Sequence, residues 1–377
     1  MCANHIGGVA HCQAVQAHPS PSPYTLSADV AEDGEHWTLS RHEADAVAAA
    51  YQRDTSEQIR RKGHRIAECG RRLIYSFDPI AGSERYKRTL AEARLCRVRT
   101  CPICAWRRAE RLAAQVGRAV QTLCAPGGLV PLMLTLTVRN CDVAVLPETL
   151  AVMLHAWSKL RKRKFFIGLI EQWTRSLEIT RGRGHIRGDS HPHMHCILMA
   201  TPDNAATLLG VDWAGLWAEV MQLEYKPQCH IMPLDTSNGA RICEALKYTV
   251  KPHNLTQHAV SGWLARIEEA LADVRVFACS QGLRITDDKD GEVAEQPGHD
   301  EVDDLPNGCP RPPKRGPVSI VYNWTGRAYI RGCVMVGQGA ADIRAQQIAL
   351  ARAAPPRAAP DGFWRSMRKP GQSQFSI

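Results

Sequence analysis

The pattern of apolar and polar positions predicts an α+β core in the middle of the chain. Short runs rich in apolar and β-branched residues indicate strands, and apolar residues at helical spacing indicate helices between them. The predicted strands are 131–138, 174–180, 191–200 and 230–235, and the predicted helices are 147–164, 203–222 and 239–252. A Gly-rich polar segment separates the second and third strands, so we expect them to pair as an antiparallel hairpin.

The segments around this core differ from it in composition. Residues 1–34 are rich in Pro, Ser, His and Ala and lack periodicity, so we expect disorder there. A Cys-rich basic region at 35–124 comes next, with helices at both ends and short strands between them, followed by the core at 125–285. An acidic and Pro/Gly-rich linker is predicted at 286–317, and a β-hairpin with a disordered tail at 318–377.

The composition is that of a globular protein with an uneven charge. No apolar run approaches the ~20 residues needed to cross a bilayer. The N-terminal residues do not resemble a secretory signal, and we expect a cytoplasmic protein without membrane contact. Residues 52–112 hold 16 Lys and Arg against 7 Asp and Glu, whereas residues 286–305 hold nine acids against one Lys. The basic block favours a nucleic-acid partner, although a solvated helix face has the same composition.

Two histidines are the first candidate for chemistry. His193 and His195 lie two apart on a predicted strand, so their side chains share one face and can bind one divalent metal ion. Glu178 on the preceding strand can fold back beside them, and His191 shares their face as a further candidate ligand. Two His and one carboxylate suit Mg²⁺ or Mn²⁺ acting on a phosphate. The alternative is a pair of ordinary surface histidines.

A predicted helix carries the second candidate group. Glu244 and Tyr248 are four residues apart and therefore neighbours, with Lys247 and Lys251 close by. A metal that polarises a phosphate, with lysines that stabilise charge, can make attack by a tyrosine feasible. A buried tyrosine beside an exposed Glu-Lys pair would give the same pattern.

The cysteines form a third group. Cys96, Cys101 and Cys104 include a C-x-x-C turn, and Cys69 is the best candidate for the fourth ligand of a structural zinc, with Cys124 as a weaker substitute. The alternative is a set of core cysteines. Arginines flank the group and suit contact with duplex DNA. These candidate DNA-binding residues are Arg97, Arg99, Arg107, Arg108 and Arg111.

Three segments together resemble a known family in order and spacing. These are LTLTV at 134–138, HPHMHCIL at 191–198 and EALKYTVK at 244–251. They resemble the motifs of the rolling-circle replication initiators of small bacterial plasmids, within the HUH endonuclease superfamily. The closest similarity is to the group with one catalytic tyrosine and a glutamate four residues before it. The cysteine-rich segment 95–112 also resembles that group.

The resemblance implies a role for each motif. His193 and His195 correspond to the metal pair, Tyr248 to the nucleophile and Glu244 to the carboxylate that activates water at termination. Lys251 and Lys247 would lie against DNA phosphates. The analogy with other members of the superfamily also supports Glu178 as the third ligand.

The implied fold is a ferredoxin-like antiparallel sheet with flanking helices and a central His-x-His strand, preceded by a small Cys-rich zinc-binding subdomain. The implied activity is site-specific nicking of one DNA strand, with a 5′-phosphotyrosine and a free 3′-OH as products. The implied partners are plasmid double-strand origin DNA, single-stranded DNA, a host helicase and a host DNA polymerase. Two alternatives stay open: a relaxase or transposase of the same superfamily, and a zinc-dependent nucleic-acid-binding regulator without catalysis.

Overall fold

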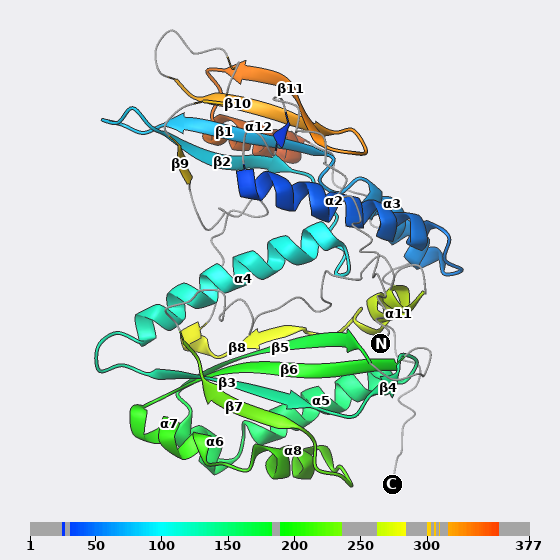
Figure 1. Ribbon diagram of the computed structural model, residues 1–377, viewed down its shortest axis with the longest axis vertical. Coiled ribbons are helices and arrows are strands. Elements are labelled where there is room, and N and C mark those ends of the chain that lie inside the picture. Colours follow the sequence, from blue (N-terminus) through cyan, green and yellow to red (C-terminus); the bar gives the residue numbers. More distant parts are fainter. Residues whose placement is uncertain are drawn as a thin grey trace, which may run out of the picture.

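The computed structural model describes residues 25–26, 31–182, 189–235, 262–283, 300–302, 305–306, 309 and 316–353. Two antiparallel sheets dominate these residues, with helices between the sheets and on their outer faces (Figure 1). This α+β architecture confirms the predicted fold class.

The first sheet combines strands from both ends of the described chain. Its order is β11-β10-β1-β2-β9. The bounds are β1 (Arg72–Pro79), β2 (Tyr86–Ala93), β9 (Asp300–Val302), β10 (Val318–Trp324) and β11 (Tyr329–Val336). Tyr75 of β1 pairs with Ile320 of β10, so the predicted C-terminal hairpin belongs to the same sheet as the Cys-rich region. Strand β9 lies inside the predicted linker and sets Asp300 opposite Arg88.

Helices cover both faces of this first sheet. One face packs on α2 (Ala31–Gln52) and α3 (Glu57–Ala67), and the other on α12 (Ala340–Ala353). The sequence pattern did not predict α12, which buries Ile343 against the sheet. At the other end of the chain, α2 begins inside the segment expected to be disordered, and Leu26 of that segment is fully buried.

The second sheet contains the predicted core strands. Its order is β7-β3-β6-β5-β8, with β4 paired to β6. The bounds are β3 (Val130–Thr137), β4 (Cys141–Asp142), β5 (Gln172–Arg181), β6 (Asp189–Ala200), β7 (Cys229–Pro233) and β8 (Phe277–Cys279). Strand β6 lies between β3 and β5, so the His-x-His strand is central, as the resemblance implied. The finer ferredoxin-like arrangement stays a prediction.

One face of the second sheet is largely apolar and covered by helices, with the buried Arg175 of β5 as a charged exception. Leu134, Met194 and Leu198 lie in the core beneath these helices. The helices are α5 (Leu146–Leu160), α6 (Lys164–Leu169), α7 (Pro202–Leu209) and α8 (Trp213–Met221). The single helix expected at 203–222 is divided, because α7 ends at Gly210 and the Asp212 carboxylate caps a new helix by accepting the Gly215 N–H.

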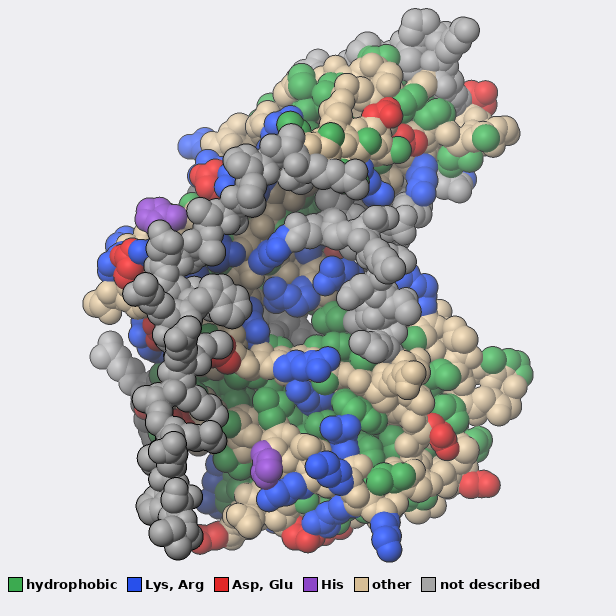
Figure 2. All heavy atoms as spheres, turned by 180° about the vertical axis from the view of Figure 1, so that it is seen from behind, with side chains coloured by type: hydrophobic (Ala, Val, Ile, Leu, Met, Phe, Trp, Pro, Cys, Tyr) green, Lys and Arg blue, Asp and Glu red, His purple; other side chains and the backbone are tan. Residues whose placement is uncertain are grey.

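The opposite face of the second sheet is divided into an apolar half and a polar half. Helix α4 (Pro102–Leu123) lies between the two sheets and packs Val116 and Val120 on the apolar half, near Ile197 and Met199 (Figure 1). The histidines of β6 lie on the polar half, two residues further along the same alternation. Figure 2 shows Lys and Arg side chains gathered in the recess between the two sheets.

Within the described part of the chain, no helix combines the length and the apolar character that crossing a membrane requires.

Candidate metal and nucleic-acid site

The hairpin of β5 and β6 brings together the histidines and the carboxylate that the sequence singled out. Alternation along β6 sets His191, His193 and His195 on one face, and the register pairs Glu178 directly with His193. Oε2 of Glu178 lies 2.8 Å from Nε2 of His195. The His191 and His193 ring centroids are 4.2 Å apart, and those of His193 and His195 are 6.0 Å apart.

Burial keeps the imidazoles of His191 and His193 in the form that binds metals. Removal from water, with a smaller contribution from the neighbouring His191, lowers the pKa of His193 to about 4. Burial also lowers the pKa of His191. Both rings are therefore neutral at pH 7, with a lone pair available for a cation.

The residue types suit a divalent metal ion, and binding of one here stays a prediction, because the described group of possible ligands whose donor atoms all lie close together is that of the four cysteines. Among the described residues, Nδ1 of His191 and Nδ1 of His193 are buried without a hydrogen-bond partner. Glu178 is 4% exposed, so its carboxylate lies in the interior beside those rings. Buried polar atoms of this kind are rare unless they pair or bind an ion. Two or three imidazoles with one carboxylate match the preference of Mn²⁺ and related ions for mixed nitrogen and oxygen ligands.

The Tyr-containing helix lies outside the described residues. Glu244, Lys247, Tyr248 and Lys251 all belong to the range 236–261. Their roles stay predictions. The described chain resumes at Gly262 and enters α11 (Trp263–Ala270), whose Trp263 Nε1 donates to Ser190 Oγ at the start of β6.

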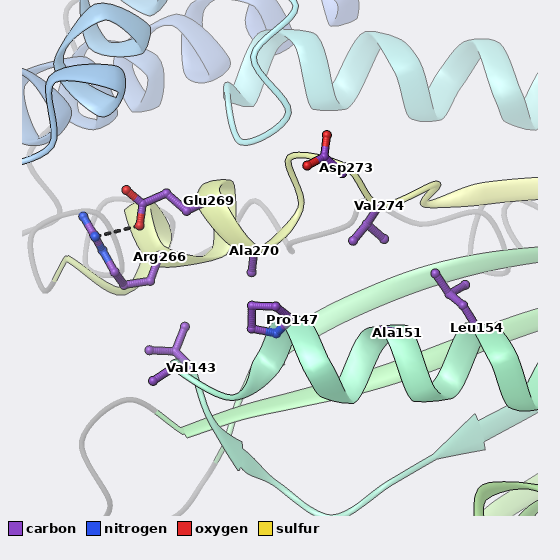
Figure 3. Close-up of a pocket in the computed structure, with 10 residues that line it drawn as sticks. Val143, Pro147, Ala151, Leu154, Arg266, Glu269, Ala270, Asp273 and Val274 are labelled. Atoms are coloured by element: carbon purple, nitrogen blue, oxygen red, sulfur yellow. Dashed lines mark ion pairs between the residues drawn. The ribbon is translucent and has the colours of Figure 1, made fainter. Parts of the chain in front are cut away.

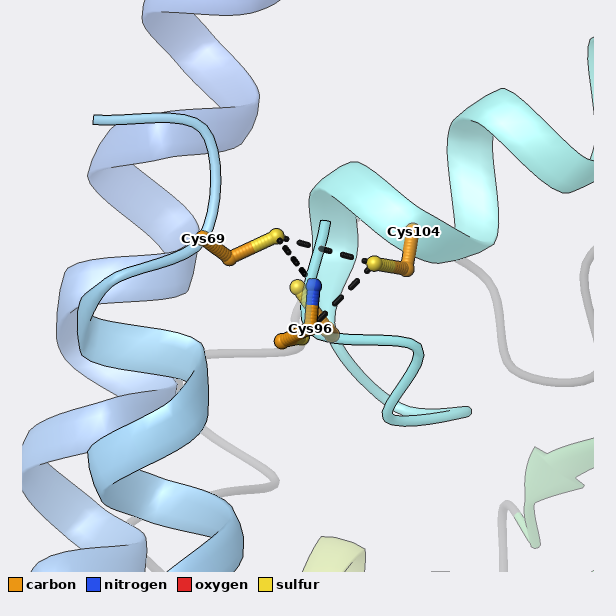
Figure 4. Close-up of side chains that lie close together, drawn as sticks. Cys69, Cys96 and Cys104 are labelled. Carbon is orange, nitrogen blue, oxygen red and sulfur yellow. Dashed lines mark hydrogen bonds between the residues drawn. The ribbon is translucent and has the colours of Figure 1, made fainter. Parts of the chain in front are cut away.

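The four predicted zinc ligands lie together (Figure 4). The sulfur atoms of Cys69, Cys96, Cys101 and Cys104 are all buried and lie within 4.8 Å of one another. The Cys104 sulfur is 3.6 Å from those of Cys69 and Cys96. A tetrahedral zinc with Zn–S bonds of about 2.3 Å sets its sulfurs about 3.8 Å apart. The group therefore could hold a metal ion of this kind.

Backbone N–H groups point at these sulfurs. The N–H of Cys96 donates to the Cys69 sulfur at 3.4 Å, and the N–H of Arg97 donates to the Cys104 sulfur at 3.2 Å. Arg97 has a φ of 60°, a left-handed conformation that is uncommon for a residue other than glycine. Thiol hydrogen bonds, the largest from Cys101, lower the pKa of Cys104, whereas burial raises the pKa of Cys101. Within the group, these contacts therefore favour the thiolate, the form that binds metals, at Cys104.

Residues far apart in the sequence hold the Cys69 loop in place. The guanidinium of Arg41, which is fully buried, donates to the backbone oxygens of Ile66 and Cys69. The hydroxyl of Tyr329 donates to the Gly70 oxygen at 2.6 Å. A Cβ on Gly70 would lie 3.1 Å from Ile103, and its φ of 65° also favours glycine. The C-terminal hairpin therefore closes over the cysteine group.

The candidate DNA-binding arginines differ in their surroundings. Arg97 and Arg111 are exposed and Arg108 is partly exposed. The guanidinium of Arg99 donates to the Val274 oxygen at 2.6 Å, so it serves a contact inside the protein. That of Arg107 lies over the Trp37 and Trp106 rings. A DNA-binding role for each of the five stays a prediction.

A buried carboxylate that the sequence reading missed joins the cysteine region to α11. Glu268 is 3% exposed and accepts hydrogen bonds from Lys62 and from Thr100, the residue before Cys101. Tyr51 adds a second connection through Thr100 Oγ1 and the Leu264 oxygen. The sequence offered one signal for this role, which is that Glu268 lies among apolar residues in a short amphipathic helix. The partners of Glu268 are distant in the sequence, so the pattern could not identify them.

A pocket of about 580 Å³ lies between α5 and the segment that contains α11 (Figure 3). Its walls are apolar, including Pro147, Leu154 and Val274, and Arg266 pairs with Glu269 at its edge. None of the site residues predicted from the sequence lines it.

Comparison with known proteins decides the family. Residues 87–330 match the family model described as "Replication protein". The chain belongs to the Replication protein family. This membership confirms the resemblance to replication initiators. The match runs from β2 to the start of β11 and contains the histidine strand and Cys96, Cys101 and Cys104, whereas Cys69 lies before it.

Curated relatives of the Replication protein family carry the name Protein rep. One from Bacillus amyloliquefaciens is 28% identical over 280 residues, which are 72% of this chain and 78% of the relative. One from Bacillus sp is 30% identical over 169 residues, 44% of this chain and 53% of the relative. One from Staphylococcus aureus is 27% identical over 176 residues, 46% of this chain and 76% of the relative. No solved structure matches the chain significantly.

Proposed function

We propose that this protein starts rolling-circle replication of a plasmid by nicking one strand at the origin. The observation that supports the proposal is the group of His193, His195 and Glu178 on the central strands. Glu178 is buried, the two imidazoles are half-buried, and Nε2 of His195 lies 2.8 Å from Oε2 of Glu178. Its position between the sheets, beside the recess where Lys and Arg gather, suits a DNA phosphate (Figure 2).

Each group has a part in the reaction. A Mg²⁺ or Mn²⁺ ion held by His193, His195 and Glu178 would supply a Lewis acid that draws electron density from the scissile phosphate. The oxygen of Tyr248 forms a bond to phosphorus and loses its proton to solvent. The bond from phosphorus to the 3′ oxygen breaks, and that oxygen takes up a proton. A 5′-phosphotyrosine and a free 3′-OH result, and Lys247 and Lys251 stabilise the phosphate charge.

The cysteine region has a separate part in this proposal. A structural zinc held by Cys69, Cys96, Cys101 and Cys104 would fix the loop that carries Arg97 and the start of α4. This loop and helix would grip the duplex beside the nicking site. A host helicase and DNA polymerase would then extend the free 3′-OH.

The test uses supercoiled plasmid carrying the native origin, with the full-length protein and Mn²⁺. We expect Tyr248→Phe to abolish nicking and the covalent adduct while binding of the duplex is retained. Tyr225→Phe is the control, since it also removes one hydroxyl, in this case one that accepts the Arg139 N–H. Undiminished nicking by Tyr248→Phe would remove Tyr248 from this role. Binding without any nicking by the native protein would favour a regulator without catalysis.

A further inference from the structure

Thr135 lies beside His195 on the neighbouring strand β3. The register pairs the two residues, so their side chains leave the same face of the sheet. The Thr135 hydroxyl is 3.2 Å from Nδ1 of His195, and Glu178 Oε2 is 2.8 Å from Nε2 of the same ring. Strands on both sides therefore hold this imidazole, one at each nitrogen.

The two contacts determine which nitrogen carries the proton. A neutral imidazole has one N–H and one lone pair, and a carboxylate only accepts. In a neutral His195 ring without a metal, Nε2 therefore donates to Glu178, and Nδ1 accepts from the Thr135 hydroxyl. A metal at Nε2 needs that lone pair, so the proton must be on Nδ1. The exchange balances, because Nε2 releases one proton to water and Nδ1 takes one up from water.

We propose that Thr135 is a positioning residue that reverses the direction of its hydrogen bond when His195 exchanges the Nε2 proton for a metal ion. A hydroxyl both donates and accepts, so it pairs with Nδ1 in either state. The His195 side chain is 12% exposed, so water is a poor substitute for this partner. Within the described residues, the Nδ1 atoms of His191 and His193 lack such a partner, so this support is particular to His195. The inference rests on the proposed function, because it assumes a metal at this site.

Binding of Mn²⁺ alone to the full-length protein, followed by electron paramagnetic resonance, gives the first test. Thr135→Val should weaken Mn²⁺ binding about 10- to 100-fold, the usual effect of losing a hydrogen-bond partner of a ligand histidine. Thr135→Ser keeps the hydroxyl and should bind Mn²⁺ as the native protein does. Thr137→Val is the matched control, since Thr137 lies on the same face of β3 but donates to the Gln228 oxygen at 2.7 Å.

The second test reads the proton position in the native protein and needs no variant. With ¹⁵N-labelled histidine, we expect His195 to carry its proton on Nε2 without metal and on Nδ1 after addition of Mg²⁺. A proton that stays on Nε2 when Mg²⁺ is bound would overturn the proposal, as would equal Mn²⁺ affinity in Thr135→Val and the native protein. If the native protein binds no Mn²⁺ or Mg²⁺ at these residues, the proposed metal site itself is wrong.

Discussion

The carboxylate of Glu268 accepts hydrogen bonds from both the backbone N–H and the hydroxyl of Thr100, at 3.0 and 2.8 Å. Lys62 donates to its other oxygen at 2.9 Å. One buried acid therefore connects α3, the loop before Cys101 and helix α11. Because α11 also contacts the start of β6 through Trp263, a continuous set of hydrogen bonds connects the cysteine group to the histidine strand.

The first prediction concerns this connection. Glu268→Ala leaves the Lys62 ammonium and the Thr100 N–H without their partner in the interior. Removal of one partner from a buried pair typically costs about 3–5 kcal/mol, so we expect a decrease of that size in the free energy of unfolding. Urea unfolding measures it. Glu269→Ala is the control, because its pair with Arg266 is partly exposed and contributes about 0–1 kcal/mol. An equal effect of the two substitutions would contradict a special role for Glu268.

The second prediction concerns the cysteine group. We expect one zinc ion per chain in the purified protein, and its loss in Cys101→Ser and Cys104→Ser, because a structural zinc needs all four thiolates. Elemental analysis gives the zinc content, and thermal unfolding should show a lower midpoint in both variants. Cys333→Ser changes an exposed cysteine outside the group and should retain the metal. A folded, active protein without zinc would indicate that the four cysteines serve only as core residues.

The third prediction concerns the histidine strand. His193→Ala and His195→Ala should each abolish Mn²⁺-dependent nicking of origin plasmid, and Glu178→Ala should remove much of it, because each loses a metal ligand. His155→Ala is the control, since His155 is exposed on α5, the helix that covers the other face of the sheet. A Glu178→Ala protein with native rate and Mn²⁺ affinity would exclude Glu178 as the third ligand, although the two histidines could still bind the ion.

The fourth prediction concerns Glu244, one helical turn before Tyr248 in the expected helix. A carboxylate that activates water would cut the regenerated origin at termination and release a free 5′ end. General-base help is typically worth about 10²–10⁴-fold. Glu244→Ala should therefore nick and form the tyrosine adduct at the native rate, but hydrolyse at termination slower by that factor. Labelled oligonucleotides report both steps. Equal loss of the two steps would give Glu244 a structural or positioning role.

Local sequence pattern was sufficient for the centre of the proposed site. Alternation along β6 and the polar segment before it predicted that Glu178 folds back beside the histidines. In the structure, Glu178 of β5 pairs with His193 of β6. The spacing of the cysteines predicted their group, including Cys69 as its most distant member. In both cases the residues that come together lie within a few dozen positions of one another. Strand periodicity or a tight turn is therefore sufficient to predict that they meet.

Contacts between distant segments could not be predicted in the same way. Nothing in β1 or β10 identifies the other as its partner, because backbone hydrogen bonds carry no sequence information. For the same reason, the sequence did not predict that Thr135 pairs with His195, although Thr135 lies in the segment 134–138 that carries part of the family resemblance. The bond from Arg99 to Val274 also depends on the position of α11, so charge alone suggested only contact with DNA.

The order of strands in the first sheet has a consequence for biosynthesis. Strand β1 leaves the ribosome early, whereas its neighbour β10 and the Tyr329 that closes over Gly70 follow only after the whole second sheet. A nascent or truncated chain therefore exposes one edge of β1 and lacks the cover of the cysteine loop. Only a chain translated through β11 completes this sheet, so premature termination leaves both the sheet and the cover of the cysteine loop unfinished.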